Sequence, residues 1–198
     1  MPKFLADKHA TNLIRITLYA ILTDNMKNTK DKIKRIKVDS LYGKKKHFNA
    51  ADRKEKLHYL IGVPLIVINV LTGSVLFFVL TDGFNNWIKY VPLVLALIAA
   101  LLSGFQTFLN LQKKVEGHRR VGNKYLAIMK RCDRLQAYIE DDAIKDKHLI
   151  ESIEEIANDI ENINKESESF PTSKSDYELA KKGIESGEES YTESELEL

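Results

Sequence analysis

The sequence predicts an all-α membrane protein, and three features carry that prediction. Two uncharged runs of 21 and 22 residues lie close together in a chain that is otherwise rich in charge, at 29% overall. Basic residues are concentrated before the first run and after the second, and apolar residues with heptad spacing follow the second run. Together these features predict a two-helix transmembrane hairpin, with cytoplasmic N-terminal helices before it and a cytoplasmic helical hairpin after it.

The first uncharged run, Leu60–Leu80, is long enough to span a bilayer. An α-helix of this length covers about 30 Å, which is the thickness of the hydrocarbon core. Leu, Ile, Val and Phe occupy every side of its helical wheel, whereas the core helix of a soluble domain would show a polar face. The second run, Val91–Gln112, follows after a short link. We therefore assign the transmembrane hairpin to residues 57–112, with spans at about 60–80 and 91–112.

The distribution of Lys and Arg predicts the orientation of the hairpin. Residues 27–56 hold 12 basic and four acidic residues, and residues 113–134 hold eight basic and two acidic ones. By the positive-inside rule both flanks, and with them both termini, are cytoplasmic. The apolar stretch Leu13–Leu22 is interrupted by Arg15 and lacks a small-residue cleavage site, so the N-terminus is expected to be retained.

Two heptad seams follow the second span, which predicts helices that pack lengthwise. The polar break "EDDAIKD" separates them and can turn the chain back, so an antiparallel helical hairpin over residues 113–166 is the simplest way to bury both. Packing between subunits, as in a coiled coil, would bury them equally well, and the sequence leaves both arrangements open. The seams are Val121, Tyr125, Ile128, Cys132, Leu135 and Ile139, and then Leu149, Ile153, Ile156, Ile160 and Ile163.

The N-terminal segment, residues 1–56, is expected to hold cytoplasmic helices. A short helix is predicted near Ala10–Met26, because an apolar stripe follows one of its faces. From about Lys44 a basic helix is predicted to continue into the first span, since no turn signal interrupts it before Pro64. The stripe consists of Leu13, Ile14, Thr17, Leu18 and Ile21.

The C-terminal segment, residues 167–198, begins with a Pro-Thr-Ser stop and contains a short predicted helix at Asp176–Gly183. Six glutamates follow Lys182 without a basic partner. Such a composition cannot bury enough apolar surface to order a chain, so we expect the last dozen residues to form an acidic disordered tail.

Residues that could carry chemistry are scattered. The five histidines show no metal-ligand spacing, and Cys132 lies in a heptad seam as a small packing residue. No glycine-rich phosphate loop or nucleophile elbow is present in the sequence. We therefore expect no enzyme, and no catalytic, cofactor or metal site. The basic flanks lack an aromatic platform, so the expected partner is the lipid bilayer and not nucleic acid. The histidines are His9, His47, His58, His118 and His148.

Polar side chains within the spans need an explanation. Ser103, Gln106 and Asn110 share one small or polar arc of the second span, and Asn69 reaches about the depth of Ser103 in an antiparallel hairpin. Amides in hydrocarbon are costly unless they meet a partner or water. Either they bond across a tight helix pair, which the frequency of small residues at helix contacts favours, or several copies turn these faces toward a water-filled pore. Both interpretations stay open.

The order of elements resembles the SLATT family of bacterial conflict-system effectors. The resemblance covers nearly all of the chain and is carried by "FNAADRKEKLHYLIG", "LALIAALLSGFQTFLNLQKKVEGHRRVGNKYLAIMKRC" and "FPTSKSDYELAKKGI". It implies a homo-oligomeric pore-forming effector that damages the cell's own membrane when infection is sensed, and so aborts phage propagation. Members are associated with nucleotide-second-messenger synthases, nucleotide-sensing domains or reverse transcriptases. A sensor or nucleotide-signal-producing partner encoded separately is therefore implied.

From the residues and the resemblance together we expect a multi-pass protein of the bacterial inner membrane that oligomerises into a pore. The alternative is a membrane-anchored scaffold whose cytoplasmic helices recruit a partner protein. A polar stripe along the second span favours the pore, because a simple anchor has no use for Gln106 and Asn110.

Overall fold

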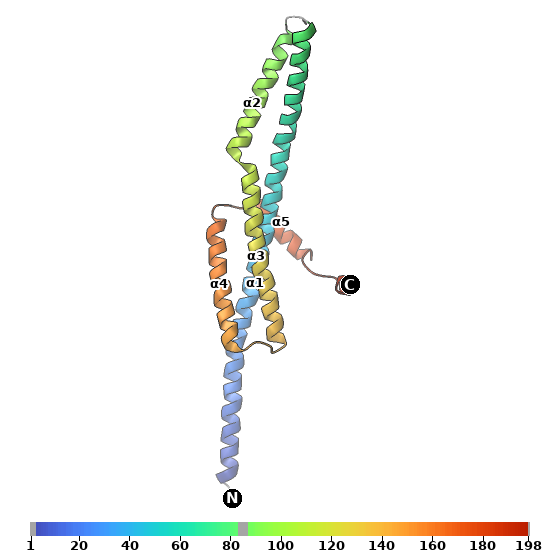
Figure 1. Ribbon diagram of the computed structural model, residues 1–198. Helices are drawn as coiled ribbons and strands as arrows, with labels where there is room; N and C mark the ends of the chain where they lie inside the picture. Colours follow the sequence, from blue (N-terminus) through green and yellow to red (C-terminus); the bar gives the residue numbers. More distant parts are fainter. Residues whose placement is uncertain (1–2, 83–86, 198) are drawn as a thin grey trace. The chain divides into compact units, whose positions relative to one another are not determined.

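The computed structural model describes residues 3–82 and 87–197, with side chains at 28–81 and 87–197, and over these residues it contains helices and no strand (Figure 1). The prediction of an all-α fold is thus confirmed. The elements are α1 (Lys3–Asp82), the 3-10 helix η1 (Ile88–Tyr90), α2 (Val91–Leu109), α3 (Leu111–Glu140), α4 (Asp146–Ser167), α5 (Lys174–Glu185) and α6 (Glu193–Leu196).

The chain divides into two compact units, which we describe one at a time. The bundle unit comprises Met1–Lys44 and Asn123–Glu166, and the hairpin unit comprises Lys45–Gly122 and Ser167–Leu198. Helices α1 and α3 each contribute to both units.

Helix α1 differs from the expectation of two separate N-terminal helices, because it continues from Lys3 to Asp82. No Gly or Pro occurs between residues 27 and 42, so nothing in that basic stretch forces the helix to end. Pro64 lies inside the helix, which continues past it. The predicted apolar stripe of Leu13–Ile21 lies outside the residues whose side chains are described.

In the bundle unit, α4 lies beside α3 and the adjacent part of α1 (Figure 1). Part of each predicted seam on α3 and α4 supplies the core, whereas Ile139, Ile153 and Ile160 are only half-buried. Helix α1 adds a third set of buried side chains that the sequence pattern did not predict. Asp142, with φ of 52°, lies in the turn between α3 and α4. The buried apolar side chains are Ile33, Ile36, Tyr125, Ile128, Cys132, Leu135, Leu149, Ile156 and Ile163.

Polar contacts surround this apolar core. The Tyr125 hydroxyl donates to Asn164 Oδ1 over 2.6 Å, and Arg131 pairs with Asp159 at 2.5 Å. Gly43 is required by the packing of α1 on α3, since a Cβ there would lie 2.8 Å from the Tyr125 ring.

In the hairpin unit, α2 returns alongside the second half of α1 (Figure 1). Both helices are long and apolar enough to cross a membrane, and only 0% and 11% of their most apolar windows are buried. A core helix of a soluble protein would be mostly buried, so these helices have the character of membrane spans. The second span ends at Leu109, three residues before the predicted end at Gln112.

The C-terminal segment is more ordered than its composition predicts. Helix α5 extends over Lys174–Glu185, and the single turn α6 follows in the part expected to be disordered. Local bonds account for α6, because the Thr192 backbone N–H donates to the Glu195 carboxylate over 2.8 Å and so caps the turn.

Candidate functional site

The two spans of the hairpin contact each other through faces that repeat every three and four residues. The less exposed positions are Ile61, Gly62, Leu65, Ile68, Thr72, Val75 and Val79 on α1, and Val91, Pro92, Leu95, Ala99, Leu102, Gln106 and Leu109 on α2. Of the polar arc predicted for the second span, Gln106 lies in this contact face, whereas Ser103 and Asn110 lie outside it. Gln106 belongs to the contact, where its Nε2 atom would lie 3.5 Å from a Cβ added at Gly62.

Asn69 and Ser103 instead lie on exposed faces of the spans. Within the part of the chain that the structure describes, the Asn69 side chain makes no hydrogen bond, so a bond from Asn69 to Ser103 or Gln106 within one hairpin is not formed. Gly73 and Gly104 are equally open, since an added Cβ would meet nothing within 4 Å. These outward groups are left for another copy, for lipid or for water.

Asn110 has a backbone role that sequence analysis missed. Its φ of 44° and ψ of 47° place it in the left-handed region, where it ends α2 and allows α3 to begin at Leu111. Asn tolerates this conformation better than most other residues. Its amide N–H donates to the Gln106 carbonyl over 3.2 Å, and its carbonyl accepts from Lys114 over 3.2 Å.

A second cluster lies where the spans leave the predicted membrane, at residues 45–56 of α1 and 111–122 of α3, which we call the base of the hairpin. Here His47 and His118 are 2% and 1% exposed, and their Nδ1 atoms lie 3.1 Å apart. Two neutral rings can share one hydrogen bond at this distance if one donates its N–H and the other accepts. Burial, followed by the neighbouring His118, lowers the pKa of His47 to about 4.

The same cause acts on His118, because burial and then Lys54 lower the pKa of that imidazole to about 4. Both rings are therefore neutral at pH 7. Burial likewise lowers the pKa of Lys54, and the nearby Arg53 and Lys114 add to the effect.

The C-terminal segment attaches to α1 at this base through Asp176, which is 3% exposed. Arg53 donates from Nε and a terminal nitrogen to the two carboxylate oxygens over 3.0 and 2.9 Å. Ser173 donates its backbone N–H and its hydroxyl to the same carboxylate over 2.7 Å, which caps α5. Burial alone would raise the pKa of Asp176, but the Arg53 and Ser173 hydrogen bonds bring it down to about 2.

The segment attaches to α3 through Phe170. A Cβ at Gly117 would overlap the Phe170 ring, so only glycine leaves space for it. The ring also lies edge-on to His118, with centroids 5.8 Å apart, and beneath the Arg120 guanidinium at 5.6 Å.

His47 and His118 are scattered in the sequence and match no motif. No sequence pattern predicts the contacts of Arg53, Phe170 and Asp176 either. A signal for part of this site was available, since Ser173 and Asp176 have capping-box spacing ahead of the predicted helix. Nothing in a single sequence pairs two histidines that are 71 residues apart. Among the side chains described, no three His, Cys, Asp or Glu gather as a possible metal-ligand set.

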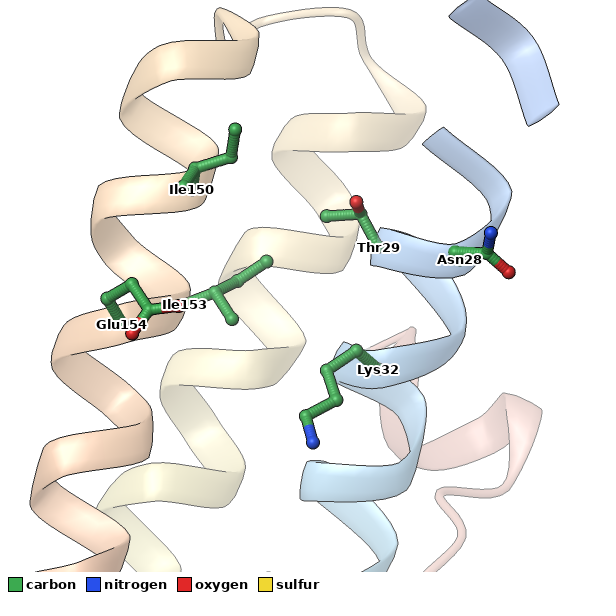
Figure 2. A pocket seen from close by; sticks show the side chains of 6 residues that line it. All are labelled: Asn28, Thr29, Lys32, Ile150, Ile153 and Glu154. Atoms are coloured by element: carbon green, nitrogen blue, oxygen red, sulfur yellow. The ribbon is translucent and has the colours of Figure 1, made fainter. Parts of the chain in front are cut away.

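The bundle unit has a hollow of about 260 Å³ between α1 and α4 (Figure 2). Ile150 and Ile153 of α4 line one side and Thr29 and Lys32 of α1 the other, with Asn28 and Glu154 at its margin.

Comparison with known proteins gives one match and two negative results. Neither the curated proteins nor the solved structures contain a match to this chain. A family model matches residues 29–197, which include both spans, the base of the hairpin and α5. The chain therefore belongs to the SLATT proteins, as a member of the SMODS and SLOG-associating 2TM effector domain family 4.

Proposed function

We propose that the protein is a membrane effector of a bacterial anti-phage system, and that several copies form a pore that permeabilises the cell's own membrane. Its family is described as a two-transmembrane effector domain, which supports the effector role. The proposed location is the bacterial inner membrane with both termini cytoplasmic, as the basic flanks favour. The mechanism requires no covalent chemistry, cofactor or nucleic acid.

One observation carries the pore. Asn69 and Ser103 are polar, belong to helices suited to spanning a membrane, and are not covered by the contact between those helices. A single hairpin cannot enclose water, so polar side chains exposed toward hydrocarbon would be costly for one isolated copy. Assembly of several copies, with these faces turned inward, removes that cost and creates a water-filled path.

The trigger in this proposal is a sensor, or an enzyme that makes a nucleotide signal, encoded separately. The family description supports such a partner, because it names association with SMODS and SLOG. The partner would act on the parts of the chain outside the membrane.

The scaffold function is a second candidate, and the hollow between α1 and α4 favours it (Figure 2). Ile150 is 56% exposed at its edge, as an apolar side chain that a partner protein would cover. A scaffold would keep its partner bound without any leakage of ions.

The residues changed to test the pore are chosen by their backbone conformation and their contacts. Asn110→Leu would strain the left-handed backbone, and Gln106 belongs to the contact within the hairpin, so both would confuse the result. The informative variant replaces Asn69 and Ser103 with Leu. Its matched control replaces Val70 and Val94 with Leu, because both valines are exposed on the spans, at 63% and 55%.

Oligomer content and single-channel current are measured in the same liposome samples. If Asn69 and Ser103 line water, the double variant keeps its oligomer and its current falls about tenfold or more, since Leu dries a narrow passage. The control keeps both oligomer and current. A loss of current only in proportion to lost oligomer would assign these residues to helix packing. An intact oligomer with unchanged current would contradict the lumen.

A further inference from the structure

We infer that residues 170–189 form a clasp that fastens α1 to α3 at the base of the hairpin, and that release of this clasp lets the base open. The attachment itself is a property of the structure. Its consequence for ion leakage rests on the proposed function.

The clasp binds α1 at three successive turns. Lys45 pairs with Glu188 and, at 3.5 Å, with Glu189. Asn49 donates its side-chain amide to the Asp176 carbonyl over 3.0 Å, and Arg53 forms the two-bonded pair with the Asp176 carboxylate. Positions 45, 49 and 53 are four residues apart, so they lie on one face of the helix.

The clasp contacts α3 through an aromatic ring. Phe170 occupies the space left by Gly117 and contacts His118 and Arg120. Because His118 is itself bonded to His47, the ring covers the point where the two helices meet. Phe48 completes that meeting point, at 3.1 Å from a Cβ added at Gly122.

Both helices continue from this point into the spans. Helix α1 does so without a break, and α3 does so through the single residue Asn110. Widening the base therefore moves the inner ends of both spans, and it cannot occur while the clasp holds α1 and α3 together.

The contacts of the clasp suit release more than permanent attachment. Water reaches one partner of each ion pair, since the Arg53 side chain is 48% exposed and that of Glu188 is 62% exposed. The other partners, Asp176 at 3% and Lys45 at 13%, gain water only when the segment leaves α1. The bundle unit, in contrast, is held by buried apolar side chains, and exposing these to water is unfavourable.

Three variants release the clasp in different ways. Phe170→Ala removes the ring, and Gly117→Ala expels it from the α3 side. Arg53→Gln leaves the Asp176 carboxylate, which is 3% exposed, without its cation, so this carboxylate gains water only by leaving the base. Gly117→Ala is the most telling, because Ala favours a helix interior over Gly and would stabilise α3 if the ring were absent. Leu179→Ala is the matched control, since Leu179 lies in α5 and is 59% exposed.

The test measures the distance between spin labels at Lys56→Cys and Lys113→Cys, two exposed positions on α1 and α3, in a Cys132→Ala background of the full chain. The same reconstituted samples are assayed for dye leakage. The clasp predicts that all three release variants lengthen or broaden the distance while the control does not. It predicts leakage higher by about tenfold in the same three.

Failure of the clasp and failure of the pore give different results. An unchanged distance in the folded release variants, or an equal change in the Leu179→Ala control, would overturn the clasp whatever the leakage. A longer distance with lower leakage would overturn its role as a lock. A longer distance in liposomes that never leak, wild type included, would leave the clasp standing and remove the pore.

Discussion

The core of the bundle unit is mainly apolar, whereas the core of the hairpin base also contains buried polar and charged side chains. In the bundle unit, Ile33, Ile128, Leu149 and Ile156 are each at most 3% exposed, and of the charged side chains described there only Lys44, at 8%, is buried. At the base, the most deeply buried large side chains include two imidazoles and the carboxylate of Asp176. An apolar core responds to volume, whereas a polar core also responds to protonation and to the presence of every partner. We therefore expect the two units to fail under different conditions.

The largest effect is expected from a charge placed in the apolar core. Ile156→Asp buries a carboxylate at a position that is 1% exposed and should cost about 4 kcal/mol of unfolding free energy for the bundle unit. Urea unfolding followed by circular dichroism in detergent measures it. The matched control, Ile150→Asp, changes the same residue type on the same helix at 56% exposure and should cost less than about 1 kcal/mol. Equal losses in the two variants would mean that the α4 seam is not the core.

Acid should act on the hairpin base and leave the apolar core unaffected. The folded-state pKa values of His47 and His118 lie at about 4, below the ordinary 6.5, so their neutral pairing stabilises fully above pH 6.5 and is lost as pH falls toward 4. For one histidine with this shift, the free energy of unfolding should be about 2 kcal/mol lower at pH 5 than at neutral pH. Lys46 faces His47, and Lys54 and Arg53 face His118, so the nearby cations oppose a further positive charge.

Thermal unfolding between pH 7.5 and pH 4.5 measures this dependence. Asp176 also faces the pair and favours its charging, but the low pKa of that carboxyl, about 2, keeps its own titration below this range. His118→Gln should flatten the profile, whereas His148→Gln, at a side chain that is 68% exposed, should leave it unchanged. A profile that stays steep in His118→Gln would assign the acid sensitivity to other groups.

The smallest effect is a chemical one and concerns Cys132. This thiol is 0% exposed in the bundle unit, and burial, with the adjacent Asp133, raises its pKa to about 11. Alkylation requires the thiolate, so the folded protein at pH 8 should react about a hundredfold more slowly than the protein unfolded in urea. Mass spectrometry of timed iodoacetamide samples measures the rates. Rapid labelling of the folded protein would show that the apolar core opens more readily than its packing predicts.

The two cores also differ in how much of each could be predicted from the sequence. The spans and the seams of α3 and α4 follow from length and from apolar spacing, which one sequence displays directly. The inner face of α1 was missed because its buried positions include Ser40, Lys44 and His47, which carry no apolar signal. Of the predicted polar residues of the spans, only Gln106 lies in the contact between the two helices. A helical wheel shows which residues of a span share a face, but not which part of that face packs against the other span.

The break at Asn110 has a consequence for how deep the protein lies in the bilayer. Helix α2 has 19 residues, or about 28 Å, which nearly equals the hydrocarbon thickness. The charged side chains of Lys113 and Lys114 follow the break at once, and hydrocarbon does not tolerate them, so Asn110 marks the level of the lipid headgroups. His118 follows Asn110 by eight residues, about 12 Å along α3, which places the imidazole pair beside the charged surface of the leaflet. An anionic leaflet at about −30 mV lowers the pH at its surface by about half a unit, and by less at His118, because the potential falls off within about 8 Å. The lipid composition of the membrane therefore sets part of the acidity that the hairpin base experiences.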